Sequence, residues 1–192
     1  MTIREKVLSA IRWTVIAKVS GQLFAWAITI FVIRILSPAD YGLMAMSMVL
    51  TSLLYLVNNI GLESVLVQRQ DLGEKMRARV FGVVILTNLS CFLITLLAAE
   101  LLAQFFGEPQ LTALIRVLSI QFLFLGFEAL PLSHLERELD FKRRSIVDFS
   151  SMFASSIVTL ALALLGMGVW ALIIGHLVLQ GIRVAGLNLI AR

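Results

Sequence analysis

Cysteine, histidine and charged residues are all scarce in this sequence. The one cysteine, Cys91, excludes an internal disulfide and any Cys-x-x-Cys metal or redox pair. The two histidines, His134 and His176, are 42 positions apart, whereas zinc-binding histidines usually come in closely spaced pairs. We therefore expect no metal ion and no other cofactor.

Charged residues make up 15% of the 192 residues, and hydrophobic residues make up 59%. Soluble domains average about 25% charged and about 45–50% apolar residues. A folded domain of this size leaves roughly 30% of its chain surface in water, so the surplus of apolar side chains has to face lipid. The sequence thus predicts an integral membrane protein.

Six long apolar runs each approach or exceed the roughly 20 residues that a membrane-crossing helix needs. The predicted spans are residues 13–36, 41–62, 80–106, 111–132, 146–165 and 169–190. Tight turns at residues 37–40, 107–110 and 166–168 alternate with longer polar stretches at residues 63–79 and 133–145. The predicted fold class is all-α: residues 1–192 form a single bundle of six transmembrane helices.

Basic residues mark one side of this predicted bundle. Twelve of the sixteen Lys and Arg residues lie in the N-terminal tail, in the two longer polar stretches and at the last position, and the three tight turns have none. Because cytoplasmic connections carry the excess of Lys and Arg, we expect both termini in the cytoplasm. The basic residues then determine topology and contact anionic lipids, and we expect no nucleic-acid binding.

Polar side chains within the spans are candidates for function, because an ionisable group costs about 2.5–3.5 kcal/mol at mid-membrane. Lys18 lies in the first span, with Gln22 and Thr29 on the same helical face. One interpretation is that this face lines a wet cavity. The other is that the Lys18 side chain extends back to the cytoplasmic headgroups, but this does not explain why Gln22 is polar. In the second span, Asn58 follows a stripe of hydroxyl-bearing residues that either packs against another helix or binds a ligand.

The sixth span carries His176, Gln180 and Arg183 at a spacing that places them on one face. His176 lies near mid-membrane and is either a proton-coupling group or a neutral side chain hydrogen-bonded to a neighbouring helix. Arg183 cannot lose its charge, so it must find water, an anion or the cytoplasmic headgroups. With Lys18 facing inward too, the bundle would hold a wet, positive lumen that attracts a phosphorylated ligand.

Small and polar residues in two other spans predict close helix packing. They are Asn88, Cys91 and Thr95 in the third span and Ser151, Ser155, Ser156 and Thr159 in the fifth. Asp148, near the start of the fifth span, either pairs with Arg144 four residues earlier or binds a cation or proton.

Five short segments, each at a predicted connection, resemble the polysaccharide flippases, the Wzx-like branch of the multidrug/oligosaccharidyl-lipid/polysaccharide flippase superfamily. The segments are IRILSPADYGL at residues 33–43, GLESVLVQR at 61–69 followed by Asp71-Leu72, FFGEP at 105–109, LDFKR at 139–143 and GMGVWAL at 166–172. Each segment is weakly specific, but all five occur in order. The resemblance covers essentially the whole chain.

The resemblance implies translocation of a polyprenyl-pyrophosphate-linked oligosaccharide across the bacterial inner membrane, for lipopolysaccharide, capsule or exopolysaccharide assembly. Family members have two six-helix lobes around a cationic cavity and are thought to work by alternating access, often with ion coupling. A cationic residue in the first span is a feature of related flippases, and this role is carried to Lys18. Gln22, Asn58, Gln180 and Arg183 are further candidates for substrate binding, and His176 is the candidate for ion coupling.

The chain is about half the usual length of the family. We expect either a fragment or a half-transporter that a second lobe completes, from a further C-terminal part or another copy. A non-transporting scaffold and a drug or cation exporter of the same superfamily stay as alternatives. An enzyme is not expected, because the carboxylates of the second polar stretch, Glu136, Glu138 and Asp140, are interleaved with basic residues and indicate a solvated helix face.

Overall fold

The computed structural model describes residues 3–68, 74–137 and 141–190, and the side chains of residues 15, 19–56, 79–129, 131–132, 135 and 143–190. The described residues form helices joined by short turns, with no strand among them. The helices are α1 (Ile3–Ile35), α2 (Pro38–Gln68), α3 (Glu74–Phe106), α4 (Gln110–Ser119), α5 (Gln121–Arg137), α6 (Phe141–Leu164) and α7 (Val169–Ile190).

The structure confirms an all-helical, polytopic membrane protein. Five stretches are long and apolar enough to cross a membrane, and a shorter apolar stretch, Val19–Ile35, lies in α1. The five are Pro38–Leu56, Arg79–Phe106, Gln110–Ala129, Arg143–Leu164 and Val169–Ile190. The three tight turns fall where the sequence predicts them, and glycines with positive φ lie in two of them, at Gly107, Gly166 and Gly168.

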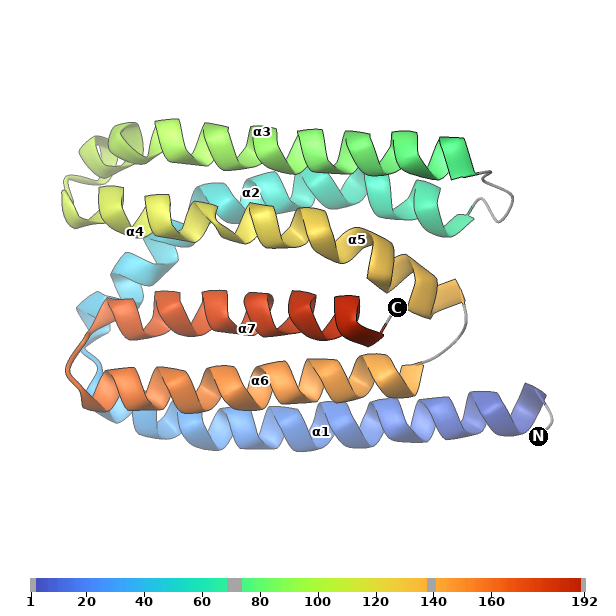
Figure 1. Cartoon of the computed structure of the whole chain (residues 1–192). Helices are drawn as coiled ribbons and strands as arrows, with labels where there is room; N and C mark the ends of the chain where they lie inside the picture. The colour runs from blue at the N-terminus through green and yellow to red at the C-terminus, as the bar shows by residue number, and fades with distance from the viewer. Residues whose placement is uncertain (1–2, 69–73, 138–140, 191–192) are drawn as a thin grey trace.

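The fourth span, predicted as one run, is two helices that meet at Ile120. The Leu123 N–H donates to the Ile120 carbonyl at 3.0 Å, an i to i+3 bond that tightens the backbone locally. α4 and α5 still follow one another through the bundle, and α5 turns away from α3 beyond the break (Figure 1).

Helical structure also extends into the two polar stretches that the sequence places between spans. α2 continues to Gln68 and α3 begins at Glu74, while α5 continues to Arg137 and α6 begins at Phe141. Hydropathy detects the part of a helix that can lie in lipid, so it underestimates the length of a helix that projects beyond the membrane.

The helices form two connected groups (Figure 1). α1 packs on α6, α6 packs on α7, and α7 contacts α5; α3 packs on α4 and α5, and α2 contacts α3, α4, α5 and α7. Among the described residues, α6 is the one helix that α1 packs against. The start of α1, the end of α7 and the helix ends that flank the two polar connections lie at one end of the bundle, and the three tight turns lie at the other.

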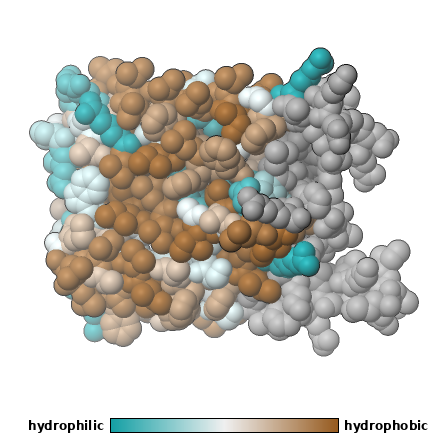
Figure 2. All heavy atoms as spheres, viewed as in Figure 1, coloured by the Kyte–Doolittle hydropathy of each residue, from teal (hydrophilic) through white to brown (hydrophobic). Residues whose placement is uncertain are grey.

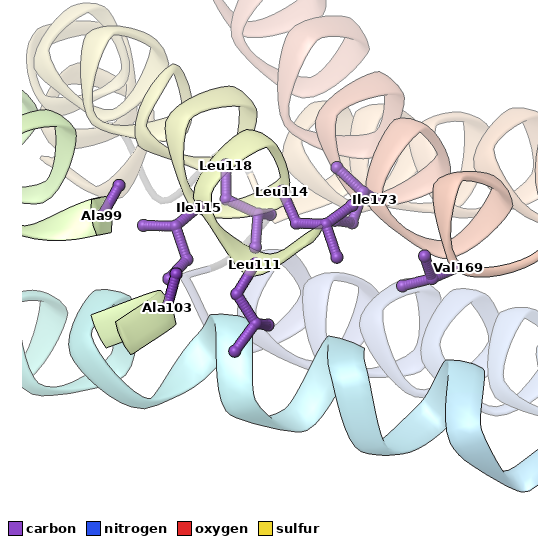
Figure 3. Close-up of a cluster of buried hydrophobic side chains, with 8 residues drawn as sticks. All are labelled: Ala99, Ala103, Leu111, Leu114, Ile115, Leu118, Val169 and Ile173. Atoms are coloured by element: carbon purple, nitrogen blue, oxygen red, sulfur yellow. The ribbon is translucent and has the colours of Figure 1, made fainter. Parts of the chain in front are cut away.

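An apolar cluster fills the centre between α3, α4 and α7 near the turn end (Figure 3). Its members are Ala99, Ala103, Leu111, Leu114, Ile115, Leu118, Val169 and Ile173, each 0–4% exposed. The outside is apolar as well, and hydrophobic residues cover most of the face seen in Figure 2 between the two ends. Leu97 in α3 is 76% exposed, which is the pattern expected of a surface that lipid covers.

At the turn end, Asp40 ties the α1–α2 turn to the α6–α7 turn. Its Oδ1 accepts a hydrogen bond from the Val169 backbone N–H at 2.9 Å, and its Oδ2 accepts one from the Ser37 hydroxyl at 2.6 Å. Gly168 has a φ of +55°, and a Cβ there would lie 2.8 Å from Asp40 Oδ1. Two of the segments that carry the family resemblance therefore meet in space.

Close packing joins α6 to α7, as the small residues of the fifth span predict. The Ser155 hydroxyl donates to the Gly175 carbonyl at 2.8 Å. A Cβ at Gly175 would overlap Thr159 Oγ1, so only glycine allows this separation of the helices. In the third span, Asn88, Cys91 and Thr95 are all buried, which confirms their prediction as packing residues.

Candidate functional site

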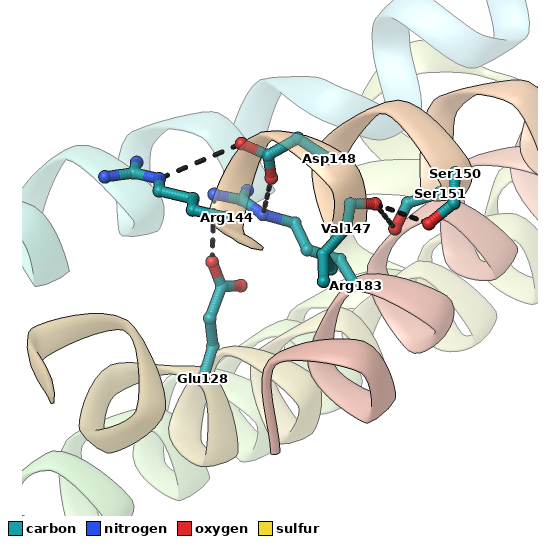
Figure 4. A network of polar contacts seen from close by, with 7 residues as sticks. All are labelled: Glu128, Arg144, Val147, Asp148, Ser150, Ser151 and Arg183. Carbon is teal, nitrogen blue, oxygen red and sulfur yellow. Dashed lines mark hydrogen bonds and ion pairs between the residues drawn. The ribbon is translucent and has the colours of Figure 1, made fainter. Parts of the chain in front are cut away.

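Arg183 of α7 lies between two carboxylates from two other helices (Figure 4). Its Nη2 is 3.1 Å from Glu128 Oε1 of α5, and its Nε is 3.0 Å from Asp148 Oδ1 of α6. The second oxygen of Asp148 is 3.8 Å from Arg144 Nε, one turn earlier on α6. These four side chains, which we call the ion-pair network, connect α5, α6 and α7.

The ion-pair network balances its charges, with two guanidinium groups and two carboxylates. Its members are unequally buried: the side chain of Glu128 is 6% exposed, whereas that of Asp148 is 32% and that of Arg183 is 25%. A carboxylate as buried as Glu128 is costly to keep charged without a partner. Arg183 therefore supplies the counter-charge that allows Glu128 inside a membrane-crossing helix.

A second polar contact joins α5 and α7, two helical turns earlier in both helices than the contact between Arg183 and Glu128. His176 Nε2 lies 3.0 Å from Gln121 Oε1, at hydrogen-bond distance. Gln121 and Glu128 are seven residues apart on α5, as are His176 and Arg183 on α7. Because both helices run in the same direction (Figure 1), the equal spacing brings both pairs together across one interface.

The α5–α7 interface carries further polar groups beside these two pairs. The Asn188 side-chain amide donates to the Phe127 carbonyl at 3.2 Å. The carboxamide oxygen of Gln180 is buried and has no hydrogen-bond partner among the described residues. The polar face of the sixth span is thus directed largely at α5, with Arg183 reaching α6 as well.

Comparison with known proteins identifies the family. The family model described as "Polysaccharide biosynthesis protein" matches residues 31–192. The chain belongs to this family. No solved protein structure gives a significant match to the chain.

Two curated relatives cover nearly all of this chain. The "Succinoglycan biosynthesis transport protein ExoT" of Rhizobium meliloti (strain 1021) is 28% identical over 94% of this chain and 36% of its own length. The "Lipopolysaccharide biosynthesis protein WzxC" of Escherichia coli (strain K12) is 22% identical over 95% of this chain and 37% of its own length. The chain therefore spans just over a third of the length of these relatives. The resemblance to polysaccharide flippases that the five segments indicate is confirmed.

The predicted site residues do not gather at one point in the structure. Lys18 and Asn58 lie in α1 and α2, but their side chains are outside the described residues. Gln22 is exposed on α1, on a part of that helix that α6 leaves uncovered. His176, Gln180 and Arg183 share the face predicted for them, and that face packs on α5. The roles of all six in binding or coupling stay predictions.

The other polar stripes have a structural use. Ser47 is fully buried on α2 and donates to the Leu43 carbonyl of its own helix, and Thr51 does the same one turn later, to the Met48 carbonyl. These buried hydroxyls fit the packing interpretation of the second-span stripe. Asp148 pairs with Arg144, in agreement with the first of its two interpretations, and it also pairs with Arg183, a contact that is not predicted from the sequence.

Sequence reasoning missed Glu128 and Gln121. Both lie in the fourth predicted span, at residues 111–132. The available signal was a carboxylate inside the apolar run at residues 111–132, with a second polar residue seven positions earlier on the same face. Because Arg183 has to find an anion, Glu128 was a candidate partner.

Proposed function

We propose that this chain forms one lobe of a membrane transporter that moves a polyprenyl-pyrophosphate-linked oligosaccharide across the bacterial inner membrane. Membership of the polysaccharide biosynthesis family carries the proposal, together with a helical fold built to cross a membrane. One relative is named as a transport protein for succinoglycan biosynthesis, and the other as a lipopolysaccharide biosynthesis protein. The product would be a lipopolysaccharide, a capsule or an exopolysaccharide.

A second lobe is part of this proposal. The relatives are nearly three times the length of the matched region, and alternating access needs two bodies that move against one another around a shared site. In the present structure α1 packs on α6 and leaves Gln22 and Thr29 exposed beside that contact. We propose that this side of α1, with Lys18 on it, faces the second lobe across the substrate path.

The proposed orientation has both termini in the cytoplasm. The start of α1, the end of α7 and the helix ends that flank the two polar connections lie at one end of the bundle, and most Lys and Arg residues fall in or beside those segments. Positively charged segments are retained on the cytoplasmic side. The ion-pair network would then lie nearer the cytoplasmic end, since Arg144 and Asp148 are in the first turns of α6 and Arg183 is in the last turns of α7.

A host strain that lacks the gene for this chain tests the function. A transporter defect makes untranslocated lipid-linked oligosaccharide accumulate and abolishes surface polymer, and reintroducing the gene restores both. Loss of polymer without accumulation of the lipid-linked precursor would instead indicate a non-transporting scaffold. Unchanged polymer and precursor levels would refute the proposal.

Two substitutions in the complementing gene test the cationic residues. Lys18→Ala and Arg183→Ala should each abolish polymer production, because a diphosphate loses a cationic ligand. Arg34→Ala and Arg116→Ala are the matched controls, since each removes an exposed cation from α1 or α4. Protein levels are measured by immunoblot, and full polymer output from both site variants would contradict a cationic substrate path.

A further inference from the structure

Asp148 lies between two arginines of neighbouring helices. One carboxylate oxygen is 3.0 Å from Arg183 Nε, and the other is 3.8 Å from Arg144 Nε. In Figure 4 the Nε atom of each arginine faces this one carboxylate, and the contact with Arg144 is the longer of the two. The place that Asp148 occupies is thus an anion site built by α6 and α7 and filled by a side chain of the protein itself.

The two carboxylates that hold Arg183 differ in access. Glu128 is 6% exposed at its side chain and is held within the interface, whereas Asp148 is 32% exposed. An ion pair that is partly in solvent is weak, because water screens its charges, and it is therefore easily exchanged. Glu128 therefore anchors Arg183 in position, and Asp148 is the partner that an outside anion can replace.

The chemistry of the site favours a phosphate group as that anion. Arg144 is the fourth residue of α6, and Arg183 lies seven residues before the end of α7, so both lie within about two helical turns of the same end of the bundle. The planar guanidinium group matches phosphate oxygens with paired donors, and two such groups suit a diphosphate better than a single phosphate.

We infer that Arg144 and Arg183 form a binding site for the diphosphate group of a membrane lipid, and that Asp148 fills this site until the diphosphate displaces it. The inference rests on the proposed function for the nature of the lipid. On binding, the Asp148 carboxylate turns to solvent and both arginines transfer their contacts to phosphate oxygens. Glu128 keeps its contact with Arg183 throughout and so acts as a positioning residue.

This exchange predicts opposite effects for the two carboxylates. The 192-residue chain is placed in phosphatidylcholine nanodiscs, and binding of farnesyl diphosphate and of inorganic pyrophosphate is measured by calorimetry. Asp148→Asn removes the competing anion and should tighten binding about fivefold, which is about 1 kcal/mol. Glu128→Gln releases the anchor of Arg183 and should weaken binding by a similar factor. Glu100→Gln, which removes an exposed charge from α3, should change nothing.

Further arms keep the test independent of any one variant. Arg144→Gln should weaken binding in the unaltered chain and should cancel the gain of Asp148→Asn in the double variant. Nanodiscs that contain phosphatidylglycerol distinguish a diphosphate from an ordinary lipid headgroup. If this lipid weakens diphosphate binding less than twofold, the site is selective for a diphosphate. If it weakens binding more, the site accepts any phosphate headgroup and the inference is overturned.

The inference is also overturned if Asp148→Asn and Glu100→Gln bind alike while both are folded, as judged by helical circular dichroism. It is likewise overturned if Asp148→Asn does not fold and Arg144→Gln binds as the unaltered chain does. The gene-deletion test of the proposed function is separate: an unchanged precursor level with tighter binding by Asp148→Asn would refute the transport role and leave the diphosphate site standing.

Discussion

The contact between Gly175 and Thr159 gives the sharpest test of how α6 and α7 pack. A Cβ added at Gly175 would overlap Thr159 Oγ1 and would lie 3.1 Å from Thr159 Cβ. Rotation of the hydroxyl cannot remove the second contact, so Gly175→Ala has to push the two helices apart. Overpacking of this kind costs about 1–3 kcal/mol. The displacement would also lengthen the hydrogen bond from the Ser155 hydroxyl to the Gly175 carbonyl.

A matched control separates this cost from the intrinsic effect of alanine. Alanine stabilises a helix interior by about 0.5–1 kcal/mol relative to glycine, and Gly82 of α3 has no described atom within 4 Å of an added Cβ. We expect Gly175→Ala to have a free energy of unfolding about 1–3 kcal/mol below that of Gly82→Ala, measured by denaturant titration in mixed micelles. Adding Thr159→Ala should recover more than half of the difference. Equal stability of the two glycine variants would refute the close packing.

Three further contacts lead to predictions that the same unfolding measurement can check. Gly168→Ala should destabilise the chain by about 1–3 kcal/mol, because the residue has a positive φ and its Cβ would crowd Asp40. A neutral effect would contradict the close contact between Asp40 and the α6–α7 turn. His176→Ala and Gln121→Ala should each destabilise, and the double variant should lose less than their sum by about 0.5–1.5 kcal/mol, since they share one hydrogen bond; full additivity would contradict the contact. Glu128→Gln should cost about 1–3 kcal/mol through the weakened ion pair, and an unaltered stability would show that this contact does not hold α5 in place.

The local features of this fold could be predicted from the sequence. Each tight turn carries its own signal, for example proline at residue 38 and glycine at 107, and the apolar runs between the turns are long enough to read as spans. The break at Ile120 carries no such signal, because neither proline nor glycine occurs there. It coincides instead with Gln121, whose side chain contacts α7, so tertiary contacts accompany the break.

The candidate site could be predicted only in part, because its contacts join residues far apart in the sequence. The spacing of His176, Gln180 and Arg183 correctly places them on one face of a helix, but periodicity does not tell which neighbour that face meets. His176 and its partner Gln121 are 55 positions apart. The pairing of Arg144 with Asp148 was predictable because it lies within one helix, at a separation of four residues.

The ion-pair network changes how the charge inside this bundle should be understood. Considered alone, Arg183 favours a positive lumen, but Glu128 and Asp148 offset it and Arg144. Under the proposed function, a diphosphate that enters this site would have to displace an anion before it could contact either arginine. Such a requirement selects for ligands that interact with arginine more strongly than one carboxylate does, and a diphosphate with two arginines meets it. Balanced charges are therefore compatible with an anion site, provided that one of the carboxylates, as at Asp148, lies within reach of the incoming group.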